Sequence, residues 1–425
     1  MLDRTLKSIA QLIAARRPGH SLPADLYTRA DVFAVDMQVI FHNHWIYAGV
    51  EMDVPEAGDV SVIEFGKASV LLMRGDDEEV RAFHNVCRHR GARLLPPGLH
   101  SIGNLTCPYH QWTYRLDGDL VHAQHMGSDF DHTCHGLKPV HLRSIGGLLF
   151  ICLADTPPDD IDDLAAVMEP RLAHYDLRNT KIAYQEDIIE EGNWKLVIEN
   201  NRECYHCSGT HPELCNSFIA LDFGYDPDSQ SPEERAAAAE HLQRYEAQTA
   251  NWEAMGFPSR AVEHLAGHAT NFRTQRLIIS GGGQSQSMDG KAVSDKLLGK
   301  DGRTDLGDVH LWTHNSWHHF MGDHALTFTV IPLSEDRTIV RSKWLVHKDA
   351  VEGVDYDLQK LIEVWRATNR QDADLVGMTH AGVSGIGYQP GPYSRFTEYQ
   401  LENFATWYIE RLTAFGYADE VSHGL

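Results

Sequence analysis

Four potential metal-binding side chains, set in two short groups, constrain this 425-residue chain more than any other feature. The first group is Cys87-x-His89 and the second is Cys107-x2-His110, with seventeen residues between them. Two thiolates and two imidazoles are enough to form a complete protein ligand set for a metal. The two groups must therefore come together in space. Nearby glycines and prolines favour the tight turns that this requires.

Two kinds of metal centre match two cysteines and two histidines. A structural zinc site takes such a set, but zinc fingers usually place both cysteines in one loop and both histidines in another. Here each loop carries one of each, which suits a two-iron cluster whose irons have different ligands. A Rieske [2Fe–2S] centre has two thiolates on one iron and two imidazoles on the other. We therefore interpret Cys87, His89, Cys107 and His110 as ligands of a Rieske cluster.

Size and composition limit the number of domains, the partners and the cellular compartment that the chain can have. With 42% hydrophobic and 23% charged residues, the chain has ample material for two globular domains. Its net charge of −23 argues against nucleic acid as a partner, because phosphates need a basic surface. Its apolar runs are too short for a membrane span. Seven cysteines, two of them assigned to the cluster, do not suggest a disulfide framework, so we expect a cytoplasmic protein.

The pattern of the chain changes at a linker-like stretch, residues 156–163. Residues 42–157 consist of short strand-like segments broken by turns, which favours an all-β module that carries the cluster on two loops. Residues 158–425 mix helical and strand-like segments, which indicates a second domain of the α+β class with a mostly antiparallel sheet. Residues 1–41 are expected to be an N-terminal helical segment.

Periodicity places the elements of the second domain. We expect helices over 161–175, 193–207, 231–255 and 355–376, and strands near 182–190, 274–280, 310–320, 325–333 and 338–347. At the start of the chain, Leu2, Leu6, Ile9 and Ile13 share one face of a predicted helix. The glycine- and serine-rich stretch 281–287 is expected to be a flexible loop, without a nucleotide-binding fingerprint.

A second candidate metal site lies where Glu203, His206 and His211 follow one another closely. Glu203 and His206 share a face if the predicted helix 193–207 is continuous. A glycine and a proline near His211 allow the chain to fold this histidine back toward His206. Two histidines and one carboxylate, with positions left open, form the ligand set of a non-haem Fe(II) oxygenase.

Helical phase identifies a second carboxylate that can complete this ligand set. Residues at intervals of four, three and four form one stripe on the predicted helix 355–376: Leu361, Trp365, Thr368 and Asp372. An unpaired carboxylate on a buried face is costly, and a metal would satisfy it. We therefore predict Asp372 as the third iron ligand, whereas Asp374 lies on another face. Glu203 is left for a different role, as a hydrogen-bond acceptor or proton holder between the two metal centres.

The pair Cys204-x2-Cys207 is interleaved with these candidate ligands. Such spacing is also found in thioredoxin-like redox motifs. Because this pair lacks a βαβ setting of its own, we interpret both residues as packed thiols.

These motifs together resemble the α subunits of Rieske non-haem iron oxygenases, over nearly the whole chain. In that family a carboxylate is followed by x2, histidine, x4 and histidine, which Glu203, His206 and His211 match. Most members begin this motif with aspartate. The glutamate here resembles the branch that acts on quaternary ammonium compounds, including carnitine monooxygenase and the glycine betaine and stachydrine (proline betaine) demethylases. Longer segments resemble the same branch: 192–206, 319–324, 346–356, 368–372 and 389–394.

The resemblance implies an oxidative N-demethylase that releases formaldehyde and has a helix-grip catalytic domain. It implies a [2Fe–2S] cluster, mononuclear Fe(II), O2 as co-substrate, and electrons from NAD(P)H through a separate flavin and iron–sulfur reductase. It also implies a head-to-tail homotrimer in which Glu203 lies between the cluster of one subunit and the iron of the next. The sequence has no dinucleotide-binding fingerprint, which agrees with a separate reductase.

The expected substrate suggests which side chains line the pocket. A quaternary ammonium group cannot donate a hydrogen bond, so aromatic faces should recognise it. Trp312, Trp317 and Phe320 are the candidates, within a tract rich in rings. Two other functions stay open: hydroxylation of an aromatic ring, and electron transfer without catalysis. The complete second ligand set argues against the latter.

Overall fold

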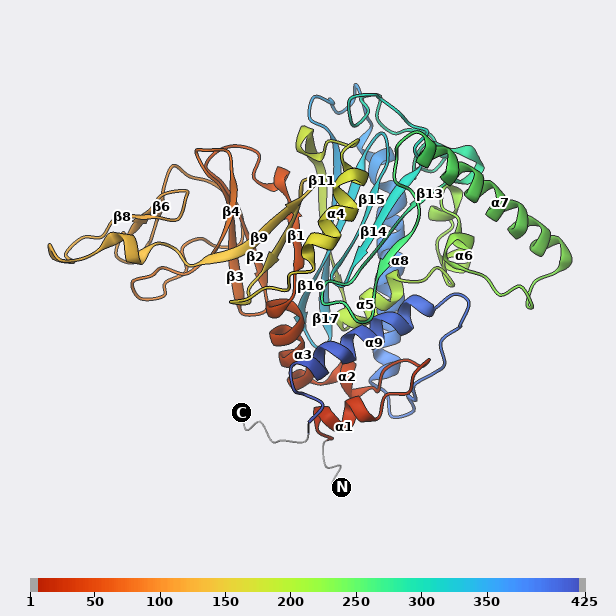
Figure 1. The fold of residues 1–425 in the computed structure, drawn as a ribbon, viewed down its shortest axis with the longest axis horizontal. Helices are drawn as coiled ribbons and strands as arrows, with labels where there is room; N and C mark the ends of the chain where they lie inside the picture. Colours follow the sequence, from red (N-terminus) through yellow and green to blue (C-terminus); the bar gives the residue numbers. More distant parts are fainter. Residues whose placement is uncertain (1–6, 420–425) are drawn as a thin grey trace. The chain divides into compact units, whose positions relative to one another are not determined.

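The computed structural model describes residues 7–419, which form two compact units. One unit is Phe41–Pro158, and the other joins the residues before Phe41 to those after Pro158. The N-terminal helices therefore belong to the same unit as the second, larger part of the chain (Figure 1).

The unit Phe41–Pro158 is built from β-strands, as its short alternating segments predict. Its main antiparallel sheet has the order β1-β10-β9-β4-β3-β2-β5. These strands are β1 (Ile46–Val50), β2 (Asp59–Phe65), β3 (Ala68–Arg74), β4 (Val80–His84), β5 (Gly98–Ser101), β9 (Pro139–Ile145) and β10 (Leu148–Cys152). A smaller sheet consists of β6 (Leu105–Thr106), β7 (Thr113–Tyr114) and β8 (Leu120–His122). The two Cys-x-His loops extend from these sheets, one after β4 and one between β6 and β7.

The second unit contains a seven-stranded antiparallel sheet with the order β11-β17-β16-β15-β14-β13-β12. Its strands are β11 (Thr180–Glu190), β12 (Val262–His264), β13 (Phe272–Leu277), β14 (Asp308–Thr313), β15 (Ser316–Phe320), β16 (Ala325–Ser334) and β17 (Arg337–His347). The long helix α8 (Leu358–Val383) packs against β11 and against α5 (Trp194–Asn201). This sheet with a helix across it confirms the predicted α+β class and helix-grip arrangement (Figure 1).

Physical signals in the sequence explain where α8 begins and which face it buries. Asp357 caps the helix by accepting hydrogen bonds from the backbone N–H groups of Gln359 and Lys360. The predicted apolar stripe is buried, with Leu361 and Trp365 at 3% and 5% exposure. The helix continues seven residues beyond the predicted end at 376, to Val383.

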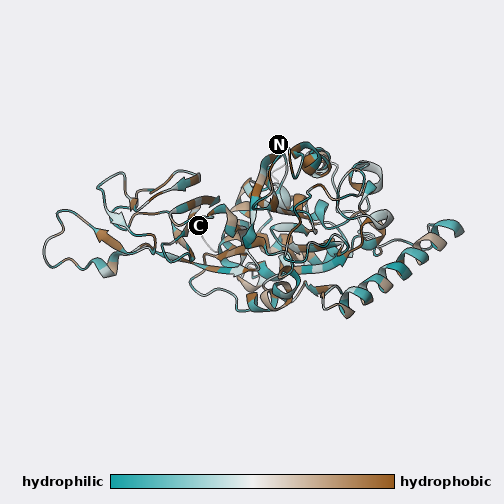
Figure 2. Cartoon of the chain, turned by 90° about the horizontal axis from the view of Figure 1, so that it is seen from above, coloured by the Kyte–Doolittle hydropathy of each residue, from teal (hydrophilic) through white to brown (hydrophobic). Residues whose placement is uncertain are grey.

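The remaining helices surround this core. They are α1 (Ile9–Ala14), α2 (Asp25–Thr28), α3 (Ala30–Asp36), α4 (Ile161–Leu172), α6 (Cys207–Thr210), α7 (Pro232–Ala254) and α9 (Tyr399–Ala414). The predicted N-terminal helix is found as α1, although Leu2 and Leu6 lie outside the described residues. Figure 2 shows that α7 is mostly hydrophilic along its length. Within residues 7–419, no helix combines the length and apolar character needed to cross a bilayer.

Two predicted elements were wrong near the candidate iron site. The helix expected over 193–207 ends at Asn201, because Glu203 accepts hydrogen bonds from the backbone N–H groups of Tyr205 and His206 and so competes with helical pairing. The strand expected over 310–320 is the hairpin β14–β15, which turns at His314 and Asn315.

Two further differences concern segments that carry no strong periodic signal. In the predicted flexible loop 281–287, Ser285, Gln286 and Ser287 are buried. The Gln286 side chain hydrogen-bonds Trp365 and Asp308, which fixes this part of the loop. Helix α9 was not predicted at all.

Candidate cluster site and candidate active site

The loop of Cys87 and His89 and the loop of Cys107 and His110 repeat one backbone conformation. The N–H of Cys87 and the N–H of Cys107 each donate to the carbonyl five residues later, at 2.8 Å in both loops. The N–H groups of Gly91 and Gln111 donate back to the respective cysteine carbonyls, at 3.0 Å in both loops. Gly91 and Gln111 have φ of +75° and +59°, so each loop closes through a left-handed residue. The sequence therefore builds the same turn twice, around two identical pairs of side chains.

The structure brings the four predicted cluster ligands together, with the thiols inside and the imidazoles outside. Cys87 and Cys107 are 2% and 1% exposed and belong to the hydrophobic core of the unit. The rings of His89 and His110 are 4.7 Å apart, and His110 is exposed. Burial raises the pKa of the Cys87 thiol, a cost that metal binding offsets because it binds the thiolate. His89 Nδ1 is buried without a hydrogen-bond partner, which suits a nitrogen that binds iron.

Two side chains that the sequence analysis did not assign support these loops. Asn85 hydrogen-bonds the backbone of Leu94 and Leu95 and so holds the far end of the first loop. The hydroxyl of Tyr114 lies 3.3 Å from Cys87 Sγ, within reach of a hydrogen bond to that sulfur. The sequence offered one signal for this role of Asn85, which is its position two residues before the first cysteine ligand.

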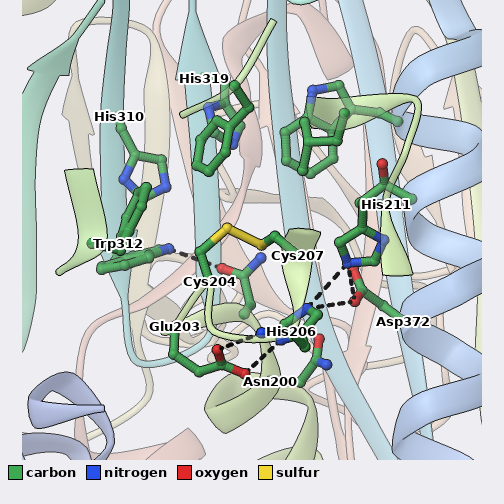
Figure 3. A pocket seen from close by; sticks show the side chains of 16 residues that line it. Asn200, Glu203, Cys204, His206, Cys207, His211, His310, Trp312, His319 and Asp372 are labelled. Atoms are coloured by element: carbon green, nitrogen blue, oxygen red, sulfur yellow. Dashed lines mark hydrogen bonds and ion pairs between the residues drawn. A yellow bond between two sulfur atoms is a disulfide. The ribbon is translucent and has the colours of Figure 1, made fainter. Parts of the chain in front are cut away.

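His206, His211 and Asp372 converge on one point from distant parts of the chain (Figure 3). The Nε2 atoms of the two histidines are 3.1 Å apart. Asp372 Oδ1 lies 3.1 Å from His211 Nε2 and 3.5 Å from His206 Nε2. Ligand atoms at neighbouring octahedral positions, with bonds of about 2.1 Å, are separated by about 3.0 Å. The spacing of these three atoms therefore fits a facial set of ligands for one metal ion.

Hydrogen bonds behind the two rings determine which nitrogens face the centre. His206 Nδ1 lies 2.5 Å from Glu203 Oε1, and a carboxylate only accepts, so this nitrogen carries the proton. His211 Nδ1 lies 2.8 Å from Gln371 Oε1. The Gln371 amide is oriented in turn, because its Nε2 donates to Glu213 at 2.9 Å. In the neutral form that binds a metal, each ring would therefore present a lone pair at Nε2.

The residues therefore fit a cation and would repel one another without one. Two imidazole nitrogens meet the oxygen Oδ1 of Asp372, which is buried, and only a proton or a metal ion between them relieves the repulsion. Although burial lowers the pKa of His206, its hydrogen bonds to Asp372 and Glu203 outweigh this effect and raise it to about 9. Burial likewise raises the pKa of Asp372, but its hydrogen bonds to the two histidines bring it below the usual value. A metal ion bound here would take the place of the proton between these side chains.

Cys204 and Cys207 form a disulfide, so the interpretation of packed free thiols was wrong. The chain leaves α5 at Arg202 and turns through Glu203–His206 into α6, which brings the two Cα atoms to 4.9 Å. The bond closes a short loop around His206 and lines the cavity beside the candidate iron site (Figure 3).

A small cavity lies over these ligands. Its aromatic lining consists of Phe218, Phe223, Trp312 and Trp365, and its polar lining includes Asn200, Asn201, His310, His319 and Thr368. Of the three predicted aromatic residues, Trp312 lines this cavity. Trp317 stacks on Phe328 at 4.9 Å instead. Phe320 alternates to the other face of the hairpin, where it contacts Tyr175 at 6.1 Å.

Comparison with known proteins agrees with this arrangement. A family described as "Ring hydroxylating alpha subunit (catalytic domain)" matches residues 177–414, and "Rieske [2Fe-2S] domain" matches residues 44–141. The chain is 45% identical over 414 residues to the glycine betaine monooxygenase oxygenase subunit of Pseudomonas aeruginosa strain UCBPP-PA14, covering 97% of this chain and 93% of that protein. It is 34% identical over 203 residues to the carnitine monooxygenase oxygenase subunit of Escherichia coli K12, covering 46% and 54%.

Solved structures share the fold at low sequence identity. A quaternary ammonium Rieske monooxygenase in complex with L-carnitine aligns with a TM-score of 0.67 at 20% identity, over 95% of this chain and 98% of that one. Naphthalene 1,2-dioxygenase from Rhodococcus sp. aligns with a TM-score of 0.67 at 18% identity, over 98% and 100%. The chain belongs to the family of Rieske oxygenase α subunits, enzymes that contain a [2Fe–2S] cluster and a mononuclear non-haem iron.

Proposed function

We propose that this chain is the oxygenase subunit of a monooxygenase that removes an N-methyl group from a betaine of the glycine betaine or proline betaine type. Glycine betaine, O2, two electrons and two protons would give dimethylglycine, formaldehyde and water. The observation that carries the proposal is the convergence of His206, His211 and Asp372 beside a cavity with aromatic walls, in a chain 45% identical to a glycine betaine monooxygenase subunit.

In this proposal each metal centre has its own ligands. Cys87, His89, Cys107 and His110 would hold the cluster, and His206, His211 and Asp372 would hold Fe(II). The iron would supply O2 activation and the cluster single electrons, which would reach the cluster from NAD(P)H through a separate flavin and iron–sulfur reductase. Glu203 and Gln371 hold the two histidine rings in place by accepting hydrogen bonds from their Nδ1–H groups.

The trimethylammonium group would bind against aromatic faces. The ring centroids of Trp312 and Phe223 are 5.4 Å apart. On another part of the wall, the ring centroids of Trp365 and His319 are 4.6 Å apart. Each ring face contributes about 0.5–2 kcal/mol to binding a cation, depending on how well water is excluded. We assign this role to Trp312 together with Phe223 and Trp365, because these three rings line the cavity and Trp317 and Phe320 do not.

The proposal extends to assembly and location. We infer a cytoplasmic head-to-tail homotrimer in which Glu203 connects the cluster of one subunit to the iron of its neighbour. Support comes from a solved quaternary ammonium Rieske monooxygenase with the same fold, which is described in terms of inter-subunit electron transfer. In the division that we propose, residues 1–41, 42–157 and 158–425 are the N-terminal helices, the cluster domain and the catalytic domain. Sedimentation of the purified protein tests the trimer.

The experiment that tests the reaction is NADH-driven O2 uptake and formaldehyde release by iron-loaded protein with a generic reductase. Glycine betaine, proline betaine, carnitine, choline and several aromatic acids are offered separately. We expect formaldehyde equal to O2 consumed with a betaine. If an aromatic acid gave a hydroxylated product without formaldehyde, the proposed function would be wrong and the reaction would be ring hydroxylation. Cluster reduction without turnover of any compound would support an electron-transfer protein.

A further inference from the structure

The cavity differs in charge between its two ends. At the iron end, Glu203 and Asp372 supply two carboxylates, which would balance a divalent ion. At the opposite wall, His310 is 2% exposed and lies near the guanidinium groups of Arg202 and Arg273, which both shift its pKa (Figure 3 shows His310 and His319 facing the candidate iron ligands). A zwitterion with separated charges fits such a cavity in one orientation.

Arg202 provides a positive charge that no carboxylate among the described residues offsets. It is 1% exposed, and its Nη2 donates to Asn271 Oδ1 and to the Thr313 carbonyl, each at 2.9 Å. Its Nε and Nη1 have no hydrogen-bond partner. Burial lowers its pKa to about 9, so the guanidinium stays charged at neutral pH. A buried cation of this kind favours an anionic ligand nearby.

Arg273 adds to this field from β13. Its register partner on β14 is Trp312, over whose ring the guanidinium lies at 5.4 Å. Nε forms an ion pair with Glu263 at 2.7 Å, but Nη1 has no partner. Trp312 therefore has a cation on one side and Phe223 close by, at 5.4 Å between centroids.

His310 is the group on this wall that can reach a ligand. It lines the cavity, and no hydrogen bond joins its ring to any of the described residues. Burial, with the nearby imidazole and guanidinium groups, lowers its pKa well below the usual value, so the ring is neutral and has one N–H. Since Nδ1 is buried, Nε2 is the nitrogen available to a ligand. An N–H at Nε2 has no acceptor among the described residues, and a bound carboxylate would supply one.

The neighbouring His319 holds His310 in place. The two residues are register partners in the hairpin, with ring centroids 4.7 Å apart. His319 Nδ1 bonds Asp308 at 2.6 Å, and Asp308 also accepts from Gln286 and from the backbone N–H of Phe320. Asp308 does not line the cavity. The wall is thus fixed before a ligand arrives, which lowers the entropy cost of binding.

We propose that His310 Nε2 donates to the carboxylate of the substrate, in the field of Arg202 and Arg273, and thereby selects short zwitterionic betaines over uncharged relatives. With the carboxylate at this wall, the N-methyl groups point toward the iron ligands. The inference rests on the proposed function and names the substrate class within it.

The test compares glycine betaine with its carboxamide, which has the same shape but no negative charge. Calorimetric titration of the anaerobic holoenzyme should give at least about 10-fold tighter binding for glycine betaine, since charge-assisted hydrogen bonds are the stronger ones. His310→Phe keeps the ring and removes the donor. This substitution should weaken the binding of glycine betaine about 10- to 100-fold and the binding of the carboxamide less than about 5-fold.

Three further variants keep the result interpretable. His310→Gln restores an N–H and should recover glycine betaine binding to within about 5-fold of the wild type. Arg202→Lys keeps the charge and should preserve the preference for the acid, which Arg202→Met should reduce. His318→Phe, at a buried position of β15 outside the cavity lining, is the matched control and should leave both affinities unchanged.

Equal losses for both ligands in His310→Phe, or equal wild-type affinity for acid and amide, would overturn the inference. Formaldehyde release from glycine betaine, measured on the same samples, distinguishes a failure of the carboxylate site from a failure of the proposed function. If the wild type releases formaldehyde but shows no preference for the acid, the carboxylate site is wrong and the proposed function stands. If no quaternary amine binds or yields formaldehyde, the proposed function itself fails.

Discussion

The two ligand sets of this chain are built in opposite ways. The cluster ligands lie within residues 87–110, on two loops with the same local turn. The iron ligands come from the turn after α5 and from α8, far apart in sequence, and meet only when the sheet and α8 have assembled. The first site depends on backbone turns, and the second depends on tertiary packing.

The two sites also differ in how exposed their ligands are and in what holds these ligands in place. His110 is exposed at the tip of its loop, whereas His211 is 1% exposed. The iron ligands are oriented by other side chains, Glu203 and Gln371, which themselves need correct placement. A site that must be reached by another protein's electrons can be local and open. A site that must hold a substrate and exclude water needs walls from several elements.

The largest expected effect separates the two sites. Asp372→Asn removes the only carboxylate of the iron ligand set, so iron affinity should fall more than about 100-fold and formaldehyde release should be lost. The visible spectrum of the cluster should not change. Metal analysis and absorbance of the same sample measure both.

The matched control for this change is Asp374→Asn, an exposed carboxylate two residues further along α8. It should retain iron and activity. Loss of the cluster in Asp372→Asn, or loss of iron in Asp374→Asn, would contradict the independence of the two sites.

The next effect concerns the side chain that orients His211. Gln371→Leu removes the acceptor for His211 Nδ1, so the ring can turn or change tautomer. Iron affinity should fall about 10- to 100-fold, as for other supporting residues of metal sites. Competition with a chelator measures this. Gln359→Leu, at an exposed position of the same helix, should leave the affinity unchanged.

A pH effect should appear in the catalytic unit through Glu199 on α5. Burial raises the pKa of this carboxyl from 4.5 to about 8, although Tyr27 donates to it at 2.8 Å. Between these values the folded protein holds a proton that the unfolded chain has lost, so its free energy of unfolding falls as pH rises. The slope is at most about 1.4 kcal/mol per pH unit.

Glu199→Gln should remove this slope, because an amide does not titrate. Relative to the wild type, the variant should gain stability as pH increases from 4.5 to 8. Denaturant unfolding monitored at several pH values measures the difference. A difference independent of pH in this range would show that Glu199 is ionised in the folded protein.

The smallest effect lies in the cluster unit. Tyr114→Phe removes a hydroxyl 3.3 Å from Cys87 Sγ. A hydrogen bond to a cluster sulfur stabilises the more negative, reduced state, so the reduction potential should fall by on the order of 50 mV. Redox titration followed by absorbance measures it. Tyr109→Phe, whose hydroxyl bonds Arg90 instead, should shift the potential little; equal shifts would assign the effect to general polarity.

The same contrast explains what could be predicted from the sequence. The cluster ligands were predictable because their loops are local and their side chains are chemically distinctive. Asp372 was predictable because α8 is a regular helix, so phase alone places its side chain on the buried face. The convergence of these residues agrees with both predictions.

Residues defined by tertiary contacts were not predictable in this way. Gln371 has no distinctive spacing, and its role depends on Glu213 and His211 being close. Phe223 and Trp365 line the cavity because of how α8 and the chain after His211 cross the sheet. Trp317 and Phe320 do not line this cavity: Phe320 lies on the opposite face of the hairpin, and Trp317, which pairs with Trp312 on the same face, stacks on Phe328.

The most direct test of the central claim is a single turnover without any reductase. Protein containing a reduced cluster and Fe(II) is mixed with glycine betaine and O2, and the products are quantified after quenching. We predict dimethylglycine and formaldehyde in equal amounts, with neither product from Asp372→Asn. Oxidation of the cluster without loss of a methyl group, or equal product from the variant, would contradict the claim that His206, His211 and Asp372 form the centre that demethylates a betaine.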